Sequence, residues 1–267
     1  MIDIHSHLIP EFDDGPKTFE ESLQMLQIAE EQGITDVFAT SHFQEIIPHQ
    51  MEEDYLVKLE DLQNRAAAKN LNVNVHSGGE LFYHEQLDET IKQHKVTTLG
   101  NWGQYVLFEF PMYLMPDGAE NILFKLSAAN YIPVVAHPER YSIVIRKPRR
   151  VLEFLKFGGL IQMNGGSILG HFGKEIQKVS LHLLKNNLVQ FIASDAHTVK
   201  GRTFVLKNVY DFLEDEIPEE YLEELLDLNP RKIINREMVE KPDLQKSEPD
   251  GGILSRLRNR FKVSDSS

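Results

Sequence analysis

The chain opens with Met1-Ile-Asp-Ile-His-Ser-His-Leu-Ile-Pro-Glu-Phe-Asp-Asp-Gly15, and this stretch governs the interpretation of the rest. Two isoleucines alternate with Asp3 and His5, which is the period of a short β-strand. His5 and His7 lie two residues apart, so a strand through both points them to the same side. Asp13-Asp14-Gly15 follows as a turn rich in carboxylates. Imidazoles at a strand end with carboxylates directly behind them favour a metal site.

Composition restricts the classes of protein that the 267 residues can form. The apolar fraction of 41% is enough for a core, and a net charge of −13 argues against nucleic acid as a main partner. The chain has no cysteine, which excludes disulfides, zinc ribbons, iron–sulfur clusters and every enzyme with a cysteine nucleophile. No apolar run is long enough to span a membrane and no signal peptide is visible, so we expect a cytoplasmic protein.

Apolar strands alternate with helical patterns along most of the chain. After the first strand, we expect strands at 34–40, 71–75, 105–108, 131–136, 160–164 and 188–193. We expect helices at 18–32, 52–70, 85–94, 117–130, 148–157, 173–186, 203–213 and 219–234. Near-continuous apolar strands separated by helices predict parallel strands that are buried on both faces. Seven such units favour an α/β fold, a distorted (β/α)7 TIM-like barrel, over an open sheet.

The composition changes near the C-terminal end. We expect the barrel to occupy residues 1–239, and residues 240–267 to form a flexible linker and a basic tail. Four positive charges fall within seven residues of this tail, at Arg256, Arg258, Arg260 and Lys262. Apolar residues at helical spacing accompany them, which predicts a weak contact with an anionic membrane surface. The alternative interpretation is a solvated, disordered end.

The predicted strand ends carry the candidate chemistry. In a (β/α) barrel the carboxyl ends of all strands face one pocket, and six of these seven strands end in an imidazole or a carboxylate. The candidate metal ligands are His5, His7, Asp14, His42, Glu80, Glu109, His137, Asp195 and His197. These are too many for one ion, so we expect two or three divalent ions, with Glu80 as the bridging carboxylate.

Several neighbouring residues leave alternatives open. Asp13 competes with Asp14 for the role of turn ligand. His49 follows His42 in a loop and could reach the mouth of the pocket. Asn164 either forms a hydrogen bond in the pocket or caps the next loop. We expect the other histidines to be packed or solvated, namely His76, His84, His94, His171 and His182.

The charge of the predicted pocket points to its substrate. Three divalent ions outweigh four carboxylates by about two positive charges, which favours a dianion such as a phosphate monoester. Arg140 and Arg202 follow ligand candidates at the mouth of the pocket. The guanidinium group matches phosphate oxygens in a bidentate way, so we expect both arginines to bind substrate phosphate. His42 or a metal-bound water would supply a proton to the leaving group.

Taken together, these segments resemble the motifs of the PHP (polymerase and histidinol phosphatase) superfamily. The resemblance runs from Met1 to about Ile234. It rests on Ile2-Asp-Ile-His-Ser-His7, Thr40-Ser-His42, Gly79-Glu80, Phe108-Glu-Phe110, Ala136-His-Pro-Glu-Arg140 and Ala193-Ser-Asp-Ala-His197. Other PHP branches often have histidine where this chain has Asp14 and Glu109. With carboxylates at these two positions, the chain most resembles the manganese-dependent protein-tyrosine phosphatases of Gram-positive capsule and exopolysaccharide operons.

The resemblance implies a trinuclear Mn²⁺ site, with Fe, Zn, Co or Mg as alternative ions. It implies that one ion binds His5, His7, Glu80 and Asp195, a second binds Glu80, Glu109 and His137, and a third binds Asp14, His42 and His197. A hydroxide that bridges the metals would attack the phosphorus of phosphotyrosine. By resemblance, the substrate is a membrane-associated bacterial capsule tyrosine kinase, which would bring the enzyme to the inner face of the membrane.

Three rival functions remain at this stage. The first is a PHP phosphatase for a small phosphomonoester such as histidinol phosphate. The second is an amidohydrolase, a class that usually needs a lysine at a middle strand end, where this chain has Glu80 and Glu109. The third is a non-catalytic, metal-stabilised regulator of the kinase, and the presence of every expected ligand and both arginines weighs against it.

Overall fold

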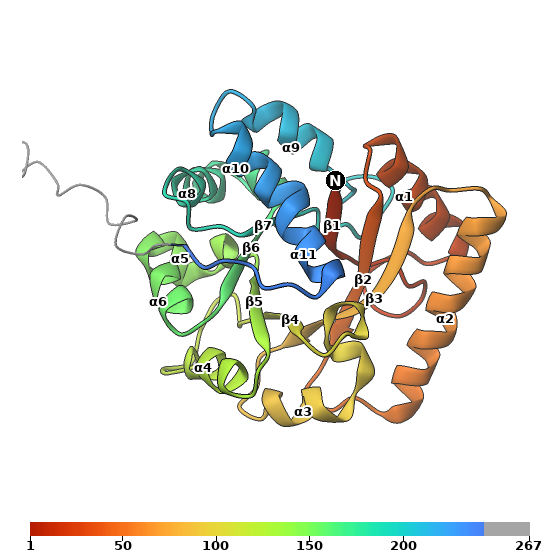
Figure 1. The fold of residues 1–267 in the computed structure, drawn as a ribbon, viewed down its shortest axis with the longest axis horizontal. Coiled ribbons are helices and arrows are strands. Elements are labelled where there is room, and N and C mark those ends of the chain that lie inside the picture. Colours follow the sequence, from red (N-terminus) through yellow and green to blue (C-terminus); the bar gives the residue numbers. More distant parts are fainter. Residues whose placement is uncertain (243–267) are drawn as a thin grey trace, which may run out of the picture.

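The computed structural model describes residues 1–242, in which seven strands form one parallel sheet (Figure 1). The strands are β1 (Ile2–Ser6), β2 (Asp36–Phe43), β3 (Asn74–Phe82), β4 (Tyr105–Glu109), β5 (Ile132–Ala136), β6 (Leu160–Asn164) and β7 (Phe191–Ala193). Neighbouring strands are parallel, and their order in the sheet follows their order in the chain. This topology confirms the predicted (β/α)7 arrangement.

The sheet closes into a barrel just beyond the end of β7. The Asp195 N–H donates to the His5 carbonyl at 2.9 Å, and the His7 N–H donates to the Ala196 carbonyl at 2.7 Å. Ser6 and Ala196 form a parallel bridge at the same place. The seam of the barrel is therefore made by the same residues that the sequence marks as ligands.

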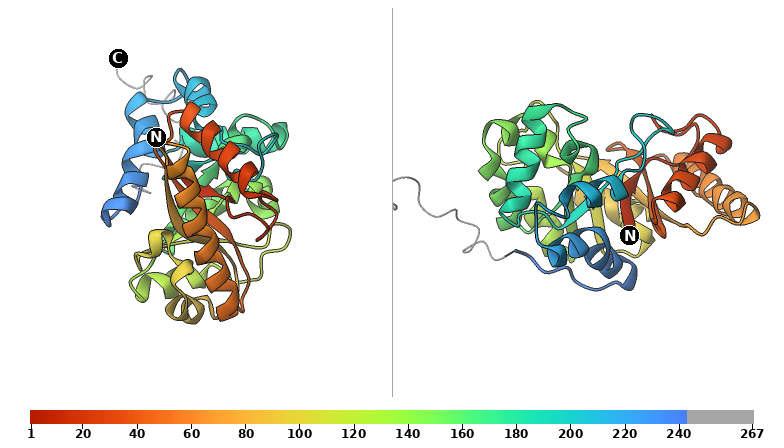
Figure 2. Two further views of the ribbon diagram at one scale, coloured as in Figure 1. Left: turned by 90° about the vertical axis from the view of Figure 1, so that its right-hand side faces the viewer. Right: turned by 90° about the horizontal axis from the view of Figure 1, so that it is seen from above.

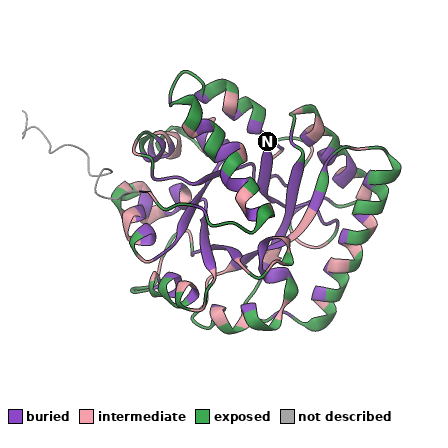
Figure 3. Ribbon diagram, viewed as in Figure 1, coloured by how far each residue is buried: buried purple, intermediate pink, exposed green. Residues whose placement is uncertain are grey.

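Helices cover the outside of the barrel (Figures 1 and 2). They are α1 (Phe19–Glu31), α2 (His49–Ala68), α3 (Leu87–Gln93), α4 (Asn121–Ala128), α5 (Ser142–Arg146), α6 (Val151–Lys156), α7 (Gly165–Ile168), α8 (Lys174–Lys185), α9 (Leu206–Leu213), α10 (Glu219–Glu223) and α11 (Asn229–Asn235). Short 3-10 turns include η3 (Pro138–Arg140) and η4 (Pro148–Arg150), and a π-helical segment (Glu224–Leu228) precedes α11. The strands are mostly buried, with β3 the least so at its amino end, whereas the helices expose one side (Figure 3).

The predicted boundary of β3 was wrong in an informative way. We expected a strand at 71–75, but β3 begins at Asn74 and continues through the glycines that follow to Phe82. A Cβ atom at Gly79 would lie 2.8 Å from both the Phe43 ring and the Val96 carbonyl oxygen. Glycine is thus required by close packing on this strand rather than by a turn. The short helices α5 and α7 also went unpredicted.

Alternate residues of each strand face the interior of the barrel. Near the amino ends these residues are apolar and form one core cluster that includes Ile4, Phe38 and Leu107. Two residues beyond Leu107 stands Glu109, and two beyond Ala193 stands Asp195. The interior therefore changes from an apolar layer to a polar layer at the carboxyl ends of the strands, as in TIM barrels.

An irregularity in β1 places a histidine in that polar layer. The pairing between β1 and β2 shifts between Asp3 and Ser6, which marks a β-bulge. Ile4 packs in the core cluster, yet the next residue, His5, reaches the polar layer as well. The bulge re-aims a side chain that simple alternation would direct away from the interior.

The far end of the described chain closes the amino end of the barrel. Ile233 of α11 and Val239 belong to the interior core cluster, and the Val239 N–H donates to the Tyr105 hydroxyl at 3.0 Å. No helix within residues 1–242 combines the length and hydrophobicity needed to cross a bilayer. The predicted basic tail lies outside the described residues, and the domain boundary at 239 stays a prediction.

Candidate metal centre

Glu80 lies at the centre of the polar layer and contacts imidazoles from three other strand ends. Its Oε2 atom lies 3.2 Å from His5 Nε2, 3.4 Å from His7 Nε2 and 3.1 Å from His42 Nδ1. Its Oε1 atom lies 2.9 Å from His137 Nε2. Burial alone would raise the pKa of Glu80, but these imidazoles hold it well below its usual value. The two oxygens of the Glu80 carboxylate thus contact different imidazoles.

A second group gathers around Asp14 at the mouth of the barrel. Its Oδ1 atom lies 3.1 Å from His197 Nε2 and 3.6 Å from His42 Nε2. The candidate ligand atoms of His7, Asp14, His42 and His197 all lie within 4.8 Å of one another. The adjacent imidazole of His197 lowers the pKa of Asp14, which is exposed at this mouth.

Glu109 completes the centre on the side of β4. Its Oε2 atom lies 3.6 Å from His137 Nε2, and it forms a compact group with Glu80 and His42. Burial and the negative charge of Glu80 raise the pKa of Glu109 to about 8. A divalent cation bound beside this buried carboxylate would favour its charged form.

Asp195 divides its two oxygens between different partners. Its Oδ2 atom accepts hydrogen bonds from Arg140 at 3.0 Å, Arg202 at 2.8 Å and Asn164 at 2.8 Å. Its Oδ1 atom, which is buried without a hydrogen-bond partner, faces His5 Nε2 at 3.5 Å. Asp195 adopts a left-handed backbone conformation with φ of 52°, strain of a kind found at functional sites.

Asn164 does both things that the sequence left as alternatives. Its side-chain amide donates to Asp195, and its side-chain oxygen accepts from the Gly166 N–H at 2.8 Å, which caps α7. The end of β6 is therefore held both to the centre and to the helix that follows.

Asp13 orients the histidines instead of facing the centre. Its carboxylate accepts from His7 Nδ1 at 2.8 Å, from the His42 N–H at 3.0 Å and from the Gly15 N–H at 2.9 Å. Burial would raise the pKa of Asp13, but the hydrogen bond with His7 outweighs it and brings the value to about 2. A carboxylate on the far nitrogen of an imidazole is a common support for a metal-binding histidine.

Gln162 gives His5 the same support from inside the barrel, and the sequence analysis missed it. Its side-chain oxygen lies 3.0 Å from His5 Nδ1. The signal was present in the sequence, because Gln162 stands two residues before Asn164 in a strand that is otherwise apolar. A buried amide at an inward position needs partners, and here the partner is a candidate ligand.

The imidazoles differ in the protonation state that their surroundings favour. Burial favours neutral His7, but its bonds to Asp13 and Glu80 outweigh burial and raise the pKa to about 10. Burial lowers the pKa of both His42 and His137. Metal binding needs neutral imidazoles, so loading of the centre would displace a proton from His7.

The chemistry of these donors fits divalent metal ions. Asp195 Oδ1, His42 Nδ1 and His197 Nε2 are buried and have no hydrogen-bond partner among the described residues. The Nε2 atoms of His5 and His7 approach to 3.3 Å, so one of them has to accept from the other or both have to face a common cation. Orphaned buried donors and acceptors are rare in folded proteins, and mixed imidazole and carboxylate ligands suit Mn²⁺, Fe²⁺ and Zn²⁺.

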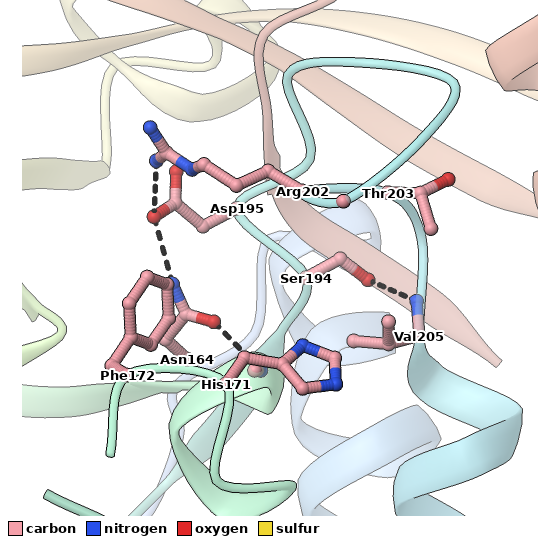
Figure 4. Close-up of a pocket in the computed structure, with 10 residues that line it drawn as sticks. Asn164, His171, Phe172, Ser194, Asp195, Arg202, Thr203 and Val205 are labelled. Atoms are coloured by element: carbon pink, nitrogen blue, oxygen red, sulfur yellow. Dashed lines mark hydrogen bonds and ion pairs between the residues drawn. The ribbon is translucent and has the colours of Figure 1, made fainter.

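A pocket of about 430 Å³ opens beside Asp195 (Figure 4). Arg202 and Asn164 donate to Asp195 from opposite sides, and Phe172 and His171 stand beside Asn164. The Arg140 guanidinium lies 4.7 Å from the centre of the Phe172 ring, within the range of a cation–π contact. The pocket thus combines a cationic end with an aromatic wall.

The structure places His49 outside the centre, at the first residue of α2. There its ring lies 5.7 Å from the ring of His94, and Glu52 completes a small cluster. Glu52 accepts from His94 Nδ1 at 3.0 Å and from the backbone N–H groups of Lys95 and Val96. These bonds make the cluster a link between α2 and the segment after α3.

The fold and the centre together define a candidate metal-dependent hydrolase of the (β/α) barrel type. The chain belongs to the family described as "Capsular polysaccharide synthesis, CpsB/CapC", whose model matches residues 1–235. This membership confirms the branch that the motifs of the sequence indicated.

Named relatives support the family assignment. The chain is 34% identical over 241 residues to CapC of Staphylococcus aureus, which covers 90% of this chain and 94% of the relative. It is 33% identical to the tyrosine-protein phosphatase YwqE of Bacillus subtilis, over 82% of this chain and 86% of the relative. A crystal structure from the pair YwqE and Streptococcus pneumoniae CpsB, described as metal-dependent tyrosine phosphatases, matches with a TM-score of 0.85. That match has 30% identity and covers 91% of this chain and 97% of the other.

The role of Asp13 can be tested by metal binding. Asp13→Ala removes the anchor of His7 but no atom that faces the centre, so we expect metal affinity to fall by about tenfold to a hundredfold. Titration of the purified variant with Mn²⁺ would measure the change. Glu31→Ala, an exposed carboxylate at the end of α1, is the control and should bind as the wild type does. Unchanged affinity in Asp13→Ala would contradict the orienting role.

Proposed function

We infer that this protein is a metal-dependent tyrosine-protein phosphatase. The observation that carries the inference is the convergence of four carboxylates and five imidazoles beside two arginines, in a chain of the CpsB/CapC family. Relatives named as tyrosine-protein phosphatases and a structural neighbour described as metal-dependent support it. The lack of cysteine is consistent, because the chemistry then needs no thiolate nucleophile.

We propose that the nine residues named from the sequence hold two or three Mn²⁺ ions. The contacts of Glu80 with four histidines support its role as the bridge. The choice of Asp14 over Asp13 is supported by their partners: Asp13 is occupied by backbone and imidazole donors, whereas Asp14 faces His197 and His42. When bound, the ions would supply a nucleophilic hydroxide near neutral pH and would neutralise phosphate charge.

The protein side chains would position the phosphate for in-line attack. Arg140 and Arg202 are held in place by Asp195 Oδ2, which uses one end of each guanidinium group. The other terminal nitrogen of Arg202 lies 3.6 Å from Asp14 Oδ2 at the mouth of the centre. We propose that both guanidinium groups turn their remaining N–H groups to equatorial phosphate oxygens, where charge builds up in the transition state. Anchored donors of this kind need no reorganisation when the charge develops.

The leaving group makes modest demands on the site. A phenolate has a pKa of about 10, far below that of an alkoxide, so it leaves with little protonation. Burial lowers the pKa of His42, so its imidazole is neutral near pH 7. The sequence left His42 and a metal-bound water as alternative proton donors. We therefore propose His42 as a metal ligand only, and water as the source of the proton.

The substrate class can be tested directly. We expect hydrolysis of a phosphotyrosine peptide to exceed that of histidinol phosphate and of a phosphoserine peptide by at least about tenfold in kcat/KM. EDTA should abolish the activity, and Mn²⁺ should restore it more fully than Mg²⁺. Full turnover by demonstrably metal-free protein would overturn the metal-dependent function, and a preference for histidinol phosphate would favour the small-molecule alternative.

The arginines can be tested separately from the metal. Arg140→Ala and Arg202→Ala should each lower kcat/KM by about ten- to a thousandfold, which corresponds to one to four kcal/mol of transition-state binding. Metal content should persist, because Asp195 keeps Asn164 and the other arginine as donors. Arg231→Ala on α11 is the control. Parallel loss of metal and activity would make the arginines structural.

We propose a membrane-associated tyrosine kinase as the physiological substrate, and a cytoplasmic location at the inner face of the membrane. The basic tail would then raise the local concentration of enzyme near the kinase. Truncation after Pro242 removes only residues outside the described part of the chain. We expect turnover of a small aryl phosphate to survive the truncation, while binding to anionic liposomes falls. Equal liposome binding by the full and truncated chains would contradict a role for the tail.

A further inference from the structure

A cationic groove of about 640 Å³ lies on the outside of the barrel, between α5, η4 and α8. The side chains of Lys147, Arg149 and Lys178 line it, together with the apolar side chains of Ile145, Pro148 and Val179. Val179 is buried, whereas the three cations are exposed. The groove therefore offers an apolar base and a positively charged rim.

About half of the other lysines and arginines in residues 1–242 pair with a carboxylate, whereas the three groove cations are gathered in one hollow without such a pair. Lys58 lies 3.1 Å from Asp54, and Arg65 lies 3.0 Å from Asp61. By contrast, none of the three groove cations has a carboxylate within 4.0 Å among residues 1–242. Glu175 is the carboxylate that lines the groove, so positive charge remains in excess. A positively charged hollow raises the local concentration of anions.

Two helices that line the groove begin, along the chain, close to residues of the metal centre and its pocket. α5 begins two residues after Arg140, and α8 begins two residues after Phe172. The Arg140 guanidinium rests over the Phe172 ring, and α5 and α8 contact each other. α5 rises about 7.5 Å over its five residues, and an extended chain advances about 3.3 Å per residue. The length of α5 corresponds to about two extended residues, and with the spans on either side of α5 a polypeptide anchored at Arg140 would reach the groove within about three to six residues.

We propose that this groove binds an acidic segment of the protein substrate, about three to six residues away from the phosphotyrosine. The proposal rests on the proposed function, because it takes phosphotyrosine at Arg140 as the anchor. The groove would discriminate between substrates by charge, and its contacts would add to the affinity of the anchored end. An extended peptide fits a narrow hollow with an apolar base, whereas a lipid surface would need the cations on a flat or convex face.

The test uses peptides with one phosphotyrosine. One set carries glutamates at the third to sixth positions on either side, and the matched set carries glutamines there. For the wild-type protein we expect kcat/KM for one acidic peptide to exceed that of its neutral match by about five- to tenfold at low ionic strength. The preference should shrink toward one at about 1 M salt, where surface charges are screened.

Variants locate the preference in the groove. The double variant Lys147→Glu with Arg149→Glu should bring the ratio of acidic to neutral peptide to one or below. Lys156→Glu with Lys232→Glu reverses two charges at the amino end of the barrel and should keep the wild-type ratio. The proposal would be wrong if the wild type showed a kcat/KM ratio of one for acidic over neutral peptides on both sides of the phosphotyrosine. It would also be wrong if the control variant lost the preference as fully as the groove variant.

Two further outcomes distinguish failure of the groove proposal from failure of the proposed phosphatase function. If the wild type hydrolyses neither peptide, the proposed function fails, and fluorescence polarisation then decides whether the acidic peptide still binds more tightly than the neutral one. Equal affinities for the acidic and the neutral peptide would contradict the groove proposal as well. Binding to phosphatidylglycerol vesicles that is lost in the double variant, with an unchanged peptide ratio, would assign the groove to a membrane and overturn the proposal.

Discussion

The two hydrogen bonds that close the barrel are the constraint on which the rest of the structure depends. They join the backbone at His5 and His7 to the backbone at Asp195 and Ala196. The same residues project their side chains toward Glu80, so the seam sets the distance between the first and last strands and also the spacing of the centre. Asp3 reinforces the seam, since its buried carboxylate accepts from the N–H groups of His5 and Ser194.

The surroundings shift the pKa values of the carboxylates in the centre in opposite directions. Burial and crowding make Glu109 hard to ionise, while Asp195 and Asp14 are held as carboxylates by nearby cations and imidazoles. Such divergent shifts within one cluster are characteristic of functional sites. The arginines bind the outer oxygen of Asp195 and leave the inner oxygen to the histidines. A single carboxylate therefore couples the candidate phosphate-binding groups to the candidate metal-binding groups.

Much of this arrangement could be predicted from the sequence because it follows from strand periodicity. The convergence of His42, Glu80 and Glu109 needs only parallel strands and a closed barrel. The bulge in β1 could not be predicted, because the pattern of the first strand reads as simple alternation and the shift appears only in the pairing with β2. The continuation of β3 was hidden by Gly79, whose requirement comes from distant atoms of Phe43 and Val96. The supporting roles of Asp13 and Gln162 depend on which side chains meet in three dimensions, and spacing along the chain does not reveal this.

The position of the seam links the centre to the lifetime of the protein. In the proposed centre, cations would bind side chains from both edges of the sheet and hold those edges together, and ligands that bind only the folded state stabilise it by mass action. Withdrawal of metal would then loosen the contact between β1 and β7 and favour opening of the barrel at that edge. Cellular proteases act on opened states, so the steady-state amount of this protein would follow the supply of its metal as well as its rate of synthesis. A cell starved of the metal would then lose the protein itself as well as its activity, because the fold depends on the metal.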